Sequence, residues 1–412
     1  MNMASPDFSA VNSEELTEII DVCTRCFADK SEKRIDLIPG AYRDENGKPW
    51  VLPFILDLEK KLLKSDTYNH EYVLFLGLDS FNELVPRLIL GENSPALKSG
   101  RAFGIQTVSG CGALRIGAEL LVRHAKYTTF YISAQTWDNH ESTFLYAGFS
   151  TCCQYRYWDP VKKGVDFEGM IEDLQQAPEN AVIILQMCAH NPTGCDLTKE
   201  QWSKVADIMQ EKKLFPFFDS AYQGFASGNL EEDAWPVRYF VDRGFEMLIT
   251  QSFSKNMGLY GDRTGCLILL LKEGRQEEVG SIRLMLTIIA RALYLCPTRH
   301  GAEIVIQTLQ DPALRKQWLE CLQTMVTRLK AVRQGLRERL EKLGTPGDWN
   351  HITTQRGMFS FTGLTSKQTT YLAKEYHMYL MPNGRANLCS LNSKNLDRFA
   401  QAVHDAVTRE AD

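Results

Sequence analysis

Apolar stretches alternate with helix-patterned stretches through residues 105–275, and this alternation constrains the fold more than any other feature. Four of the apolar stretches lie at 130–133, 181–186, 214–218 and 247–250. Strands that alternate with helices form a mainly parallel sheet sandwiched by helices, and such sheets bind ligands outside the carboxyl ends of their strands. The sequence therefore predicts an α/β fold with its site at one edge of the sheet.

A smaller α+β unit is expected after this region. A long helical stretch at 311–343 leads into a short strand pattern at 357–361. A chain of 412 residues is long enough for one large core and a second, smaller one. We therefore predict three parts: an N-terminal segment, 1–45, that joins the small domain, a large ligand-binding domain, 46–310, and a small C-terminal domain, 311–412.

Composition narrows the class of protein. The net charge of −5 favours neither nucleic acid nor a membrane surface as a partner, and no apolar run is long enough for a membrane span. Residues 1–11 contain no long apolar or arginine-rich targeting pattern, so a cytoplasmic location is expected. The eleven cysteines are scattered, and the pair Cys23 and Cys26 has no second pair nearby. We expect reduced structural thiols and no metal site.

A single lysine lies on a loop rich in serine and glycine between two apolar strands. The loop runs from Ser252 through Lys255 to Arg263. Burial and nearby cations lower the pKa of such a lysine and free its amine to act as a Schiff-base nucleophile. Arg263 can hold a phosphate. From this loop alone, a solvated lysine is the more common interpretation, because most lysines on glycine-rich loops are exposed to solvent.

Two further strand ends carry candidate ligand groups. Ser109-Gly110-Cys111 follows an extended segment and precedes a helical pattern, and the free N–H groups at a helix start bind phosphate. Trp137 follows the strand at 130–133 and can stack on a flat ring. A tight turn without ligand and a tryptophan in the core are the respective alternatives.

Asn191 and Asp219 each follow a buried strand pattern. An isolated buried carboxylate is costly, so Asp219 needs a partner, either a protonated pyridine nitrogen or a structural salt bridge. Gly40 lies in a Pro-Gly turn that can bring backbone N–H groups close to a ligand. Tyr72 can offer a phenol, although a half-buried surface tyrosine is the more common interpretation, and a plain turn explains Gly40 equally well.

Taken together, these segments resemble a known family. The sequence is similar to the cytosolic aspartate aminotransferases, which belong to the class I aminotransferases and to the fold-type-I enzymes dependent on pyridoxal 5′-phosphate (PLP). The resemblance runs from about residue 30 to the C-terminus. Its motifs are Pro-Gly-Ala-Tyr-Arg (39–43), Asn-His-Glu-Tyr (69–72), Gly-Ala-Leu-Arg-Ile-Gly-Ala (112–118), Thr-Trp-Asp-Asn-His (136–140), Ala-His-Asn-Pro-Thr-Gly (189–194), Phe-Phe-Asp-Ser-Ala-Tyr (217–222) and Gln-Ser-Phe-Ser-Lys-Asn (251–256).

The resemblance implies a role for each matching residue. Lys255 would form the Schiff base with PLP and move the proton, and Asp219 would pair with the pyridinium nitrogen. Tyr222 and Asn191 would hydrogen-bond the ring oxygen, and Trp137 would stack on the ring. The remaining cofactor contacts would come from Ser109, Gly110, Cys111, Ser252 and Arg263, with Tyr72 reaching in from a second subunit.

The substrate contacts follow in the same way. Arg385 would hold the α-carboxylate of the substrate through a bidentate pair, assisted by Gly40, Trp137 and Asn191. Arg291 of a second subunit would hold the distal carboxylate. The expected substrates are dicarboxylic amino acids and 2-oxo acids, and a site shared by two chains implies a homodimer.

Several positions depart from the family pattern, and four of them bear most directly on the site. Cys111 stands where a threonine hydroxyl is usual, and Pro39 lies where the family has a more flexible loop. Gln186 replaces a histidine behind Asp219, which should interrupt the supporting relay, and Leu295 changes the segment after Arg291. We expect these changes to weaken PLP binding and to reduce activity.

Three functions are compatible with this pattern. The first is an aminotransferase that moves the amino group between L-aspartate and 2-oxoglutarate. The second is a PLP-dependent racemase that makes D-aspartate after reprotonation from the opposite face. The third is a weakly active or inactive paralogue with a binding role, which the intact Lys255, Asp219, Arg291 and Arg385 disfavour.

Overall fold

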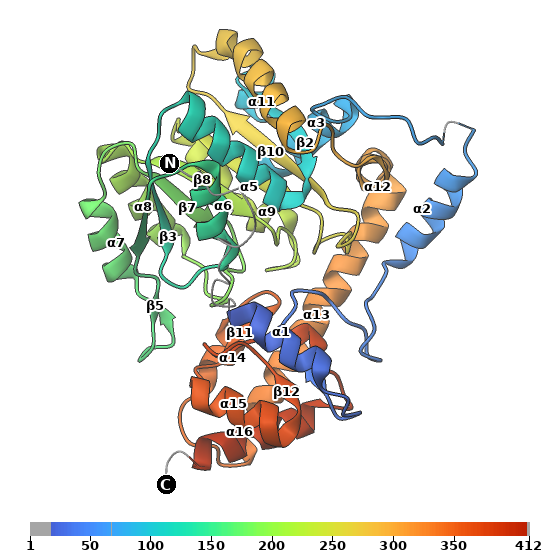
Figure 1. Ribbon diagram of the computed structural model, residues 1–412, viewed down its shortest axis with the longest axis vertical. Helices are drawn as coiled ribbons and strands as arrows, with labels where there is room; N and C mark the ends of the chain where they lie inside the picture. Colours follow the sequence, from blue (N-terminus) through green and yellow to red (C-terminus); the bar gives the residue numbers. More distant parts are fainter. Residues whose placement is uncertain (1–17, 67, 410–412) are drawn as a thin grey trace, which may run out of the picture.

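A seven-stranded sheet forms the centre of the molecule (Figure 1). The computed structural model describes residues 18–66 and 68–409. Residues 1–11, in which the sequence shows no targeting pattern, lie outside the described residues. Along the sheet the strands follow the order β2 (Ala102–Val108), β10 (Thr264–Leu270), β9 (Met247–Ser252), β8 (Phe215–Ser220), β7 (Val182–Gln186), β3 (Thr129–Ser133) and β4 (Thr151–Tyr155). The predicted α/β fold is confirmed.

One strand of this sheet runs against the others. β10 pairs antiparallel with both β2 and β9, whereas β9, β8, β7, β3 and β4 pair in parallel. The sheet is thus mainly parallel, as expected. Because β10 is reversed, its first residues lie at the same edge as the carboxyl ends of β2 and β9. The loop between β9 and β10, which carries Lys255, therefore stays at this edge.

Both faces of the sheet are buried. In β7, Val182 and Ile184 belong to one apolar core, whereas Ile183 and Leu185 belong to the other. This follows from the alternation of side chains along a strand and explains why the strands are apolar throughout. One face is covered by α5 (Ser109–Glu119), α6 (Asn139–Ala147) and α11 (Val279–Leu293). The other is covered by α3 (Asp79–Leu90), α8 (Lys199–Glu211), α10 (Trp235–Asp242) and α12 (Arg299–Gln310).

A second group of elements lies below the sheet in Figure 1. The long helix α13 (Pro312–Lys342) connects it to the sheet region, and Asp311 caps this helix by accepting hydrogen bonds from the backbone of residues 313 and 314. The group also contains α14 (Asn350–Thr354), α15 (Ser366–Tyr376), α16 (Leu396–Arg409), β11 (Phe359–Phe361), β12 (Met378–Tyr379) and β13 (Arg385–Asn387).

The N-terminal segment joins this second group. β1 (Ile35–Asp36) pairs in parallel with β12, and α1 (Glu18–Ala28) packs nearby. α2 (Pro53–Leu63) extends away from the body as an arm (Figure 1). Other elements are α4 (Pro95–Lys98), α7 (Phe167–Gln176), α9 (Leu230–Asp233), β5 (Trp158–Asp159) and β6 (Gly164–Val165). The domain boundaries at 46 and 311 stay a prediction. In the described part of the chain, no helix is long and apolar enough to span a bilayer.

Candidate active site

A cavity of about 170 Å³ opens at the carboxyl edge of the sheet, where the loops after five strands meet the second group of elements. The fold brings together there most of the residues that the sequence singled out. The predicted residues that line the cavity are Gly40, Ser109, Gly110, Cys111, Trp137, Asn191, Asp219, Tyr222, Ser252, Lys255, Arg263 and Arg385.

One end of the cavity is a cradle for an oxyanion. Ser109, at the start of α5, has a backbone φ of 63°, and its N–H donates to the carbonyl of Arg263 at 2.8 Å. The Arg263 guanidinium donates back to Ser109 Oγ at 2.7 Å and approaches Cys111 Sγ at 3.7 Å. A Cβ on Gly265 would lie 2.3 Å from the Ser109 carbonyl carbon, so this glycine allows β10 to approach the turn. A guanidinium, hydroxyls and a helix start therefore converge on one place.

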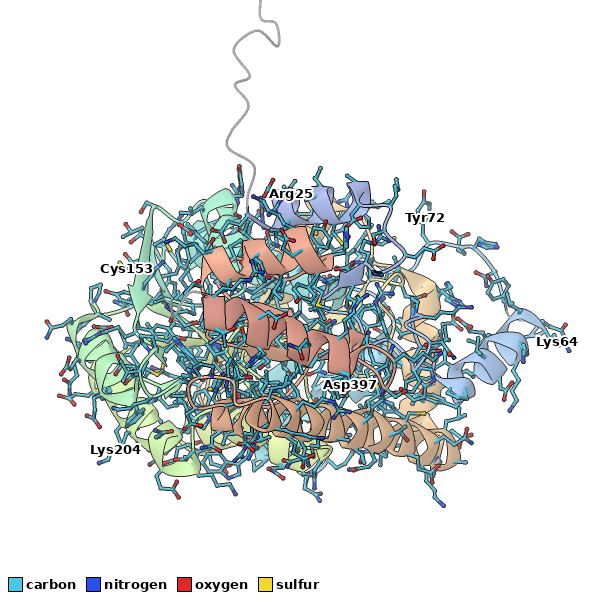
Figure 2. All side chains as sticks on the ribbon, turned by 90° about the horizontal axis from the view of Figure 1, so that it is seen from below. Arg25, Lys64, Tyr72, Cys153, Lys204 and Asp397 are labelled. Atoms are coloured by element: carbon cyan, nitrogen blue, oxygen red, sulfur yellow. The ribbon has the colours of Figure 1, made fainter. Side chains whose placement is uncertain are left out.

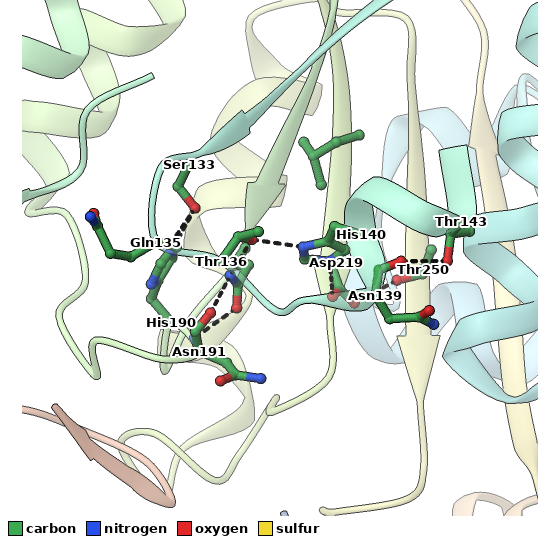
Figure 3. A network of polar contacts seen from close by, with 12 residues as sticks. Ser133, Gln135, Thr136, Asn139, His140, Thr143, His190, Asn191, Asp219 and Thr250 are labelled. Atoms are coloured by element: carbon green, nitrogen blue, oxygen red, sulfur yellow. Dashed lines mark hydrogen bonds and ion pairs between the residues drawn. The ribbon is translucent and has the colours of Figure 1, made fainter. Parts of the chain in front are cut away.

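The other end holds a buried carboxylate within a chain of polar contacts (Figure 3). Asp219 accepts hydrogen bonds from His140 Nε2 at 3.0 Å and from Thr250 Oγ1 at 2.9 Å. Burial alone would raise the pKa of Asp219. The hydrogen bonds from His140 and Thr250 and the charge of Lys255 outweigh burial and hold that pKa below its ordinary value. Asp219 is therefore an anion prepared to accept a hydrogen bond from a cation in the cavity.

Gln186 does not interrupt the support behind Asp219, which corrects the expectation from the sequence. Its carboxamide accepts from the Asn191 N–H at 2.7 Å and donates to the Asn191 carbonyl at 2.8 Å. It also contacts Thr136 Oγ1 at 3.4 Å, and Thr136 in turn bonds His140 Nδ1 at 2.8 Å. The contacts from Asp219 through His140 therefore continue to Asn191, because glutamine supplies both a donor and an acceptor.

Lys255 lies between the two ends, half-buried, with its Nζ 5.5 Å from the centre of the Tyr222 ring. Burial lowers the pKa of Lys255, and the charges of Arg263 and Arg385 act in the same direction, against the opposing charge of Asp219. Burial raises the pKa of Tyr222, so its phenol stays protonated and can donate. The predicted tuning of this lysine amine thus has a physical basis in the fold.

Arg385 closes the cavity from the second group of elements. Its guanidinium donates to the Ile38 carbonyl at 3.0 Å and to Asn191 Oδ1 at 3.3 Å, and it lies 4.5 Å from the Phe359 ring centre. Within the described residues its buried Nε has no hydrogen-bond partner. A buried donor without an acceptor is costly, so this Nε is available for a carboxylate.

The turn at Pro39 and Gly40 is fixed by Asn387. The Asn387 side chain donates to the Pro39 carbonyl at 2.6 Å and to the Ala41 carbonyl at 2.9 Å. A Cβ on Gly40 would approach the Phe359 ring to 3.1 Å, which leaves little room for any other residue. The turn is therefore held in place beside Arg385.

Two predicted residues lie outside this cavity. Tyr72 is 73% exposed, and Figure 2 shows it on the segment that leads to the α2 arm. Arg291 is exposed in the last turn of α11, 4.9 Å from the Phe75 ring centre. Leu295 is also exposed and does not line the cavity of its own chain. Neither Tyr72 nor Arg291 lines the cavity of its own chain, so their roles from a second subunit stay a prediction.

Several residues at the site were not predicted from the sequence, among them Thr250, Phe359 and Ile19. Thr250 lies opposite Asp219 in the register of β8 and β9, and two residues before Ser252 on the same strand, a spacing that places it on the same face. Phe359 and Ile19 also line the cavity, from β11 and α1. No local pattern marks them, because each comes from an element distant in the sequence.

This donor set fits a flat, phosphate-bearing cofactor. The cradle around Arg263 suits a phosphate, and ionised Asp219 suits a protonated ring nitrogen at the opposite end. A Cβ on Gly110 would lie 3.2 Å from Ser252 Cβ, so the glycine leaves the cradle open. Lys255 lies between the two, with an amine of lowered pKa. PLP carries each of the groups that these residues would hold.

The comparisons with known proteins agree with this site. The family model "aminotransferase class I and II" matches residues 32–403. Cytoplasmic aspartate aminotransferase of Gallus gallus is 46% identical over 99% of this chain and 100% of its own length. The structure of the cytoplasmic aspartate aminotransferase of Saccharomyces cerevisiae is similar with a TM-score of 0.94, at 38% identity, over 98% of each chain.

A neighbour of different specificity is nearly as similar. An aromatic-amino-acid aminotransferase from Burkholderia pseudomallei, covalently bound to pyridoxal phosphate, has a TM-score of 0.93 at 35% identity, over 98% of this chain and 100% of its own. The chain therefore belongs to the class I and II aminotransferases. It is a PLP-dependent enzyme that resembles the aspartate aminotransferases, and the family, the fold and the cofactor predicted from the sequence are confirmed.

Proposed function

We propose that the enzyme transfers the amino group between L-aspartate and 2-oxoglutarate, giving oxaloacetate and L-glutamate. The observation that carries this proposal is the convergence of Lys255, Asp219, the Arg263 cradle and Arg385 in one cavity. The cytoplasmic aspartate aminotransferases that match nearly the whole chain support the choice of substrates. They also support a cytoplasmic location.

The cofactor contacts follow from the cavity. Arg263, Ser109, Gly110 and Ser252 would hold the phosphate, with the partner subunit's Tyr72 completing the cradle and Cys111 contributing little because its thiol is a weak donor. Asp219 would hold the ring nitrogen. Asn191 and Tyr222 would donate to the ring oxygen, and Trp137 would cover the ring face. When bound, PLP withdraws electrons from the substrate Cα and so makes its hydrogen acidic.

Lys255 moves the proton in this mechanism. Because burial lowers its pKa, Nζ can be neutral when substrate arrives and can accept the Cα proton as a general base. The same atom then carries that proton as an ammonium and returns it as a general acid. Asp219 stays ionised throughout, since its pKa is held below the ordinary range. Lys255 thus gains and loses a proton during the reaction, whereas Asp219 keeps its negative charge.

Arg385 orients the substrate. Its unpartnered Nε and its Nη atoms form a fork that matches the geometry of the α-carboxylate. The partner subunit's Arg291 would bind the distal carboxylate and so select dicarboxylic substrates. Phe359 and Asn191 hold the Arg385 guanidinium in place, and the turn at Gly40 lies against the Phe359 ring.

The active enzyme is a homodimer in this proposal. Large apolar side chains are exposed on α11 and on the α2 arm, including Leu284 at 58%, Ile288 at 52% and Leu63 at 59%. Exposed apolar surface of this kind marks an interface. A second copy of the chain is its occupant, because Arg291 lies on α11 and Tyr72 on the segment after α2, and neither lines the cavity of its own chain. Analytical ultracentrifugation of the pure protein tests this, and a monomer that retains full activity would contradict it.

A single half-reaction tests the chemistry. PLP-loaded protein is mixed with L-aspartate in the absence of 2-oxoglutarate, and the released oxaloacetate is measured. Transamination predicts one oxaloacetate for each bound PLP, followed by turnover when 2-oxoglutarate is added. Chiral chromatography of the amino acid completes the test. D-aspartate without oxaloacetate would mean a racemase, and neither product would mean a protein without this activity.

A further inference from the structure

A cavity larger than the cofactor site lies elsewhere in the molecule. It measures about 510 Å³ and is enclosed by α13, the segment 225–232 and the segment 353–357. It shares no lining residue with the cofactor cavity. Its volume is within the range of about 300–1,000 Å³ that small-molecule sites occupy.

A buried arginine on α13 forms part of its wall. Arg333 is 3% exposed and donates to the carbonyls of Ile352 and Gly357 at 2.9 Å and of Phe359 at 2.5 Å. Burial lowers the pKa of Arg333 to about 10, so the guanidinium remains charged at neutral pH. Among the residues that the structure describes, no carboxylate forms an ion pair with it. A charge buried without a counter-ion is costly, and a bound anion would remove this cost.

The donors of Arg333 are not exhausted by these carbonyls. A guanidinium has five N–H groups, and the carbonyls that it contacts are reached through one N–H of Nη1 and those of Nη2. Within the described residues, Nε and the second N–H of Nη1 have no hydrogen bond to protein. Two donors of a buried cation are thus left for a ligand.

Two more cations line the same cavity. Lys330 precedes Arg333 by three residues on α13, which places both on one face of the helix, and its ammonium is exposed. Arg356 lies across the cavity and is 3.5 Å from Glu232, the one carboxylate in the lining. Three positive charges therefore face one negative charge, and Glu232 neutralises only Arg356.

We propose that this cavity is a binding site for a small phosphate-type dianion. Arg333 would provide the buried end of the site with its two free donors, and Lys330 would provide a mobile point charge at the entrance. A dianion matches the charges of Arg333 and Lys330, the two cations that lack a carboxylate partner. A neutral ligand would leave both charges uncompensated. Guanidinium and ammonium groups together are the usual donors for phosphate in proteins.

Equilibrium dialysis of the PLP-loaded enzyme tests the proposal, since bound PLP fills the phosphate cradle of the active site. The probes are inorganic phosphate and glycerol phosphate, which separate a site for the free ion from one for a phosphate ester. The variants are Lys330→Ala and Lys330→Glu, with Lys316→Ala as a control on the same helix outside the cavity. Lys330 is exposed and takes part in none of the described hydrogen bonds, so its variants should fold.

The wild-type enzyme and the control should bind at least one probe with equal affinity. Lys330→Ala should weaken binding about fivefold, as expected for one exposed charge at contact distance, and Lys330→Glu should weaken it further. Two outcomes would overturn the proposal. One is wild-type protein that binds neither probe, and the other is Lys330→Glu protein that binds as tightly as wild type, because the phosphate would then occupy another place.

Discussion

Replacing Cys111 by threonine tests how the cradle holds the cofactor phosphate. Cys111 is the third residue of the Ser109-Gly110-Cys111 turn, and its Sγ lies 3.7 Å from Arg263 Nη2. Ser109 Oγ accepts from the same nitrogen at 2.7 Å, so the Arg263 guanidinium is already in place. A thiol donates weakly, whereas a hydroxyl at this position adds one strong donor to the cradle.

The size of the effect follows from the charge of the acceptor. A hydrogen bond to a charged group contributes about 1.5–3 kcal/mol, and each 1.4 kcal/mol is a factor of about ten in affinity. Cys111→Thr should therefore tighten PLP about tenfold to a hundredfold. At a fixed and saturating PLP concentration, a tenfold change should raise the free energy of unfolding by about 1.4 kcal/mol, because PLP binds the folded state.

The assay is a titration of apoprotein with PLP, followed by thermal unfolding at one PLP concentration. Cys111→Ser should tighten PLP binding as Cys111→Thr does, whereas Cys111→Ala should not. This comparison separates the effect of the hydroxyl group from the effect of side-chain size. Cys321→Thr is the matched control, because Cys321 lies on α13 away from the cavity. If wild type retains stoichiometric PLP through long dialysis and Cys111→Thr binds no tighter, the argument about the weakened cradle is wrong.

Three further predictions concern single residues. Borohydride reduction of the PLP-loaded protein followed by peptide mapping should label Lys255, and a label on another lysine would contradict its assignment. Arg291→Ala should lower kcat/KM for aspartate by an amount that corresponds to a loss of about 2–5 kcal/mol of transition-state stabilisation, whereas kcat/KM for alanine should hardly change. Equal losses for the two substrates would exclude Arg291 as the distal clamp. Burial raises the pKa of Asp233 to about 6 from 3.8, so the folded state binds more protons than the unfolded state between these values. Stability from this group should therefore fall as pH rises from about 4 to 6, by up to about 3 kcal/mol, and Asp233→Asn should flatten this slope in urea titrations.

Much of the site could be predicted because the fold is repetitive. Each parallel strand ends at the same edge, so residues that follow successive apolar runs, such as Ser109, Asn191 and Asp219, meet there without any knowledge of tertiary contacts. The loop that carries Lys255 stays at that edge for a less obvious reason. It connects β9 to the reversed strand β10, and the apolar patterns of these strands do not reveal their direction.

The supporting contacts were harder to predict. Gln186 was expected to weaken Asp219, because a residue-by-residue comparison treats a lost histidine as a lost contact. In the structure, its carboxamide pairs with both backbone groups of Asn191. Such compensation depends on which polar groups the fold brings within reach. The contact between Phe359 and Arg385 could not be predicted for the same reason. Only the pairing of β11 with β13 brings these two residues side by side.

In the proposed mechanism, the choice of substrate depends on more than one chain. The fold does not decide it, because an aspartate and an aromatic aminotransferase resemble this chain almost equally, with TM-scores of 0.94 and 0.93. Arg385 does not decide it either, since its proposed ligand is the α-carboxylate that every amino acid carries. In this mechanism Arg291 discriminates, and it lies exposed on α11 outside the cavity of its own chain. Selectivity for dicarboxylic substrates should therefore arise only when two chains associate, whereas Lys255, which moves the proton, and Asp219, which would hold the ring nitrogen, lie in the cavity of one chain.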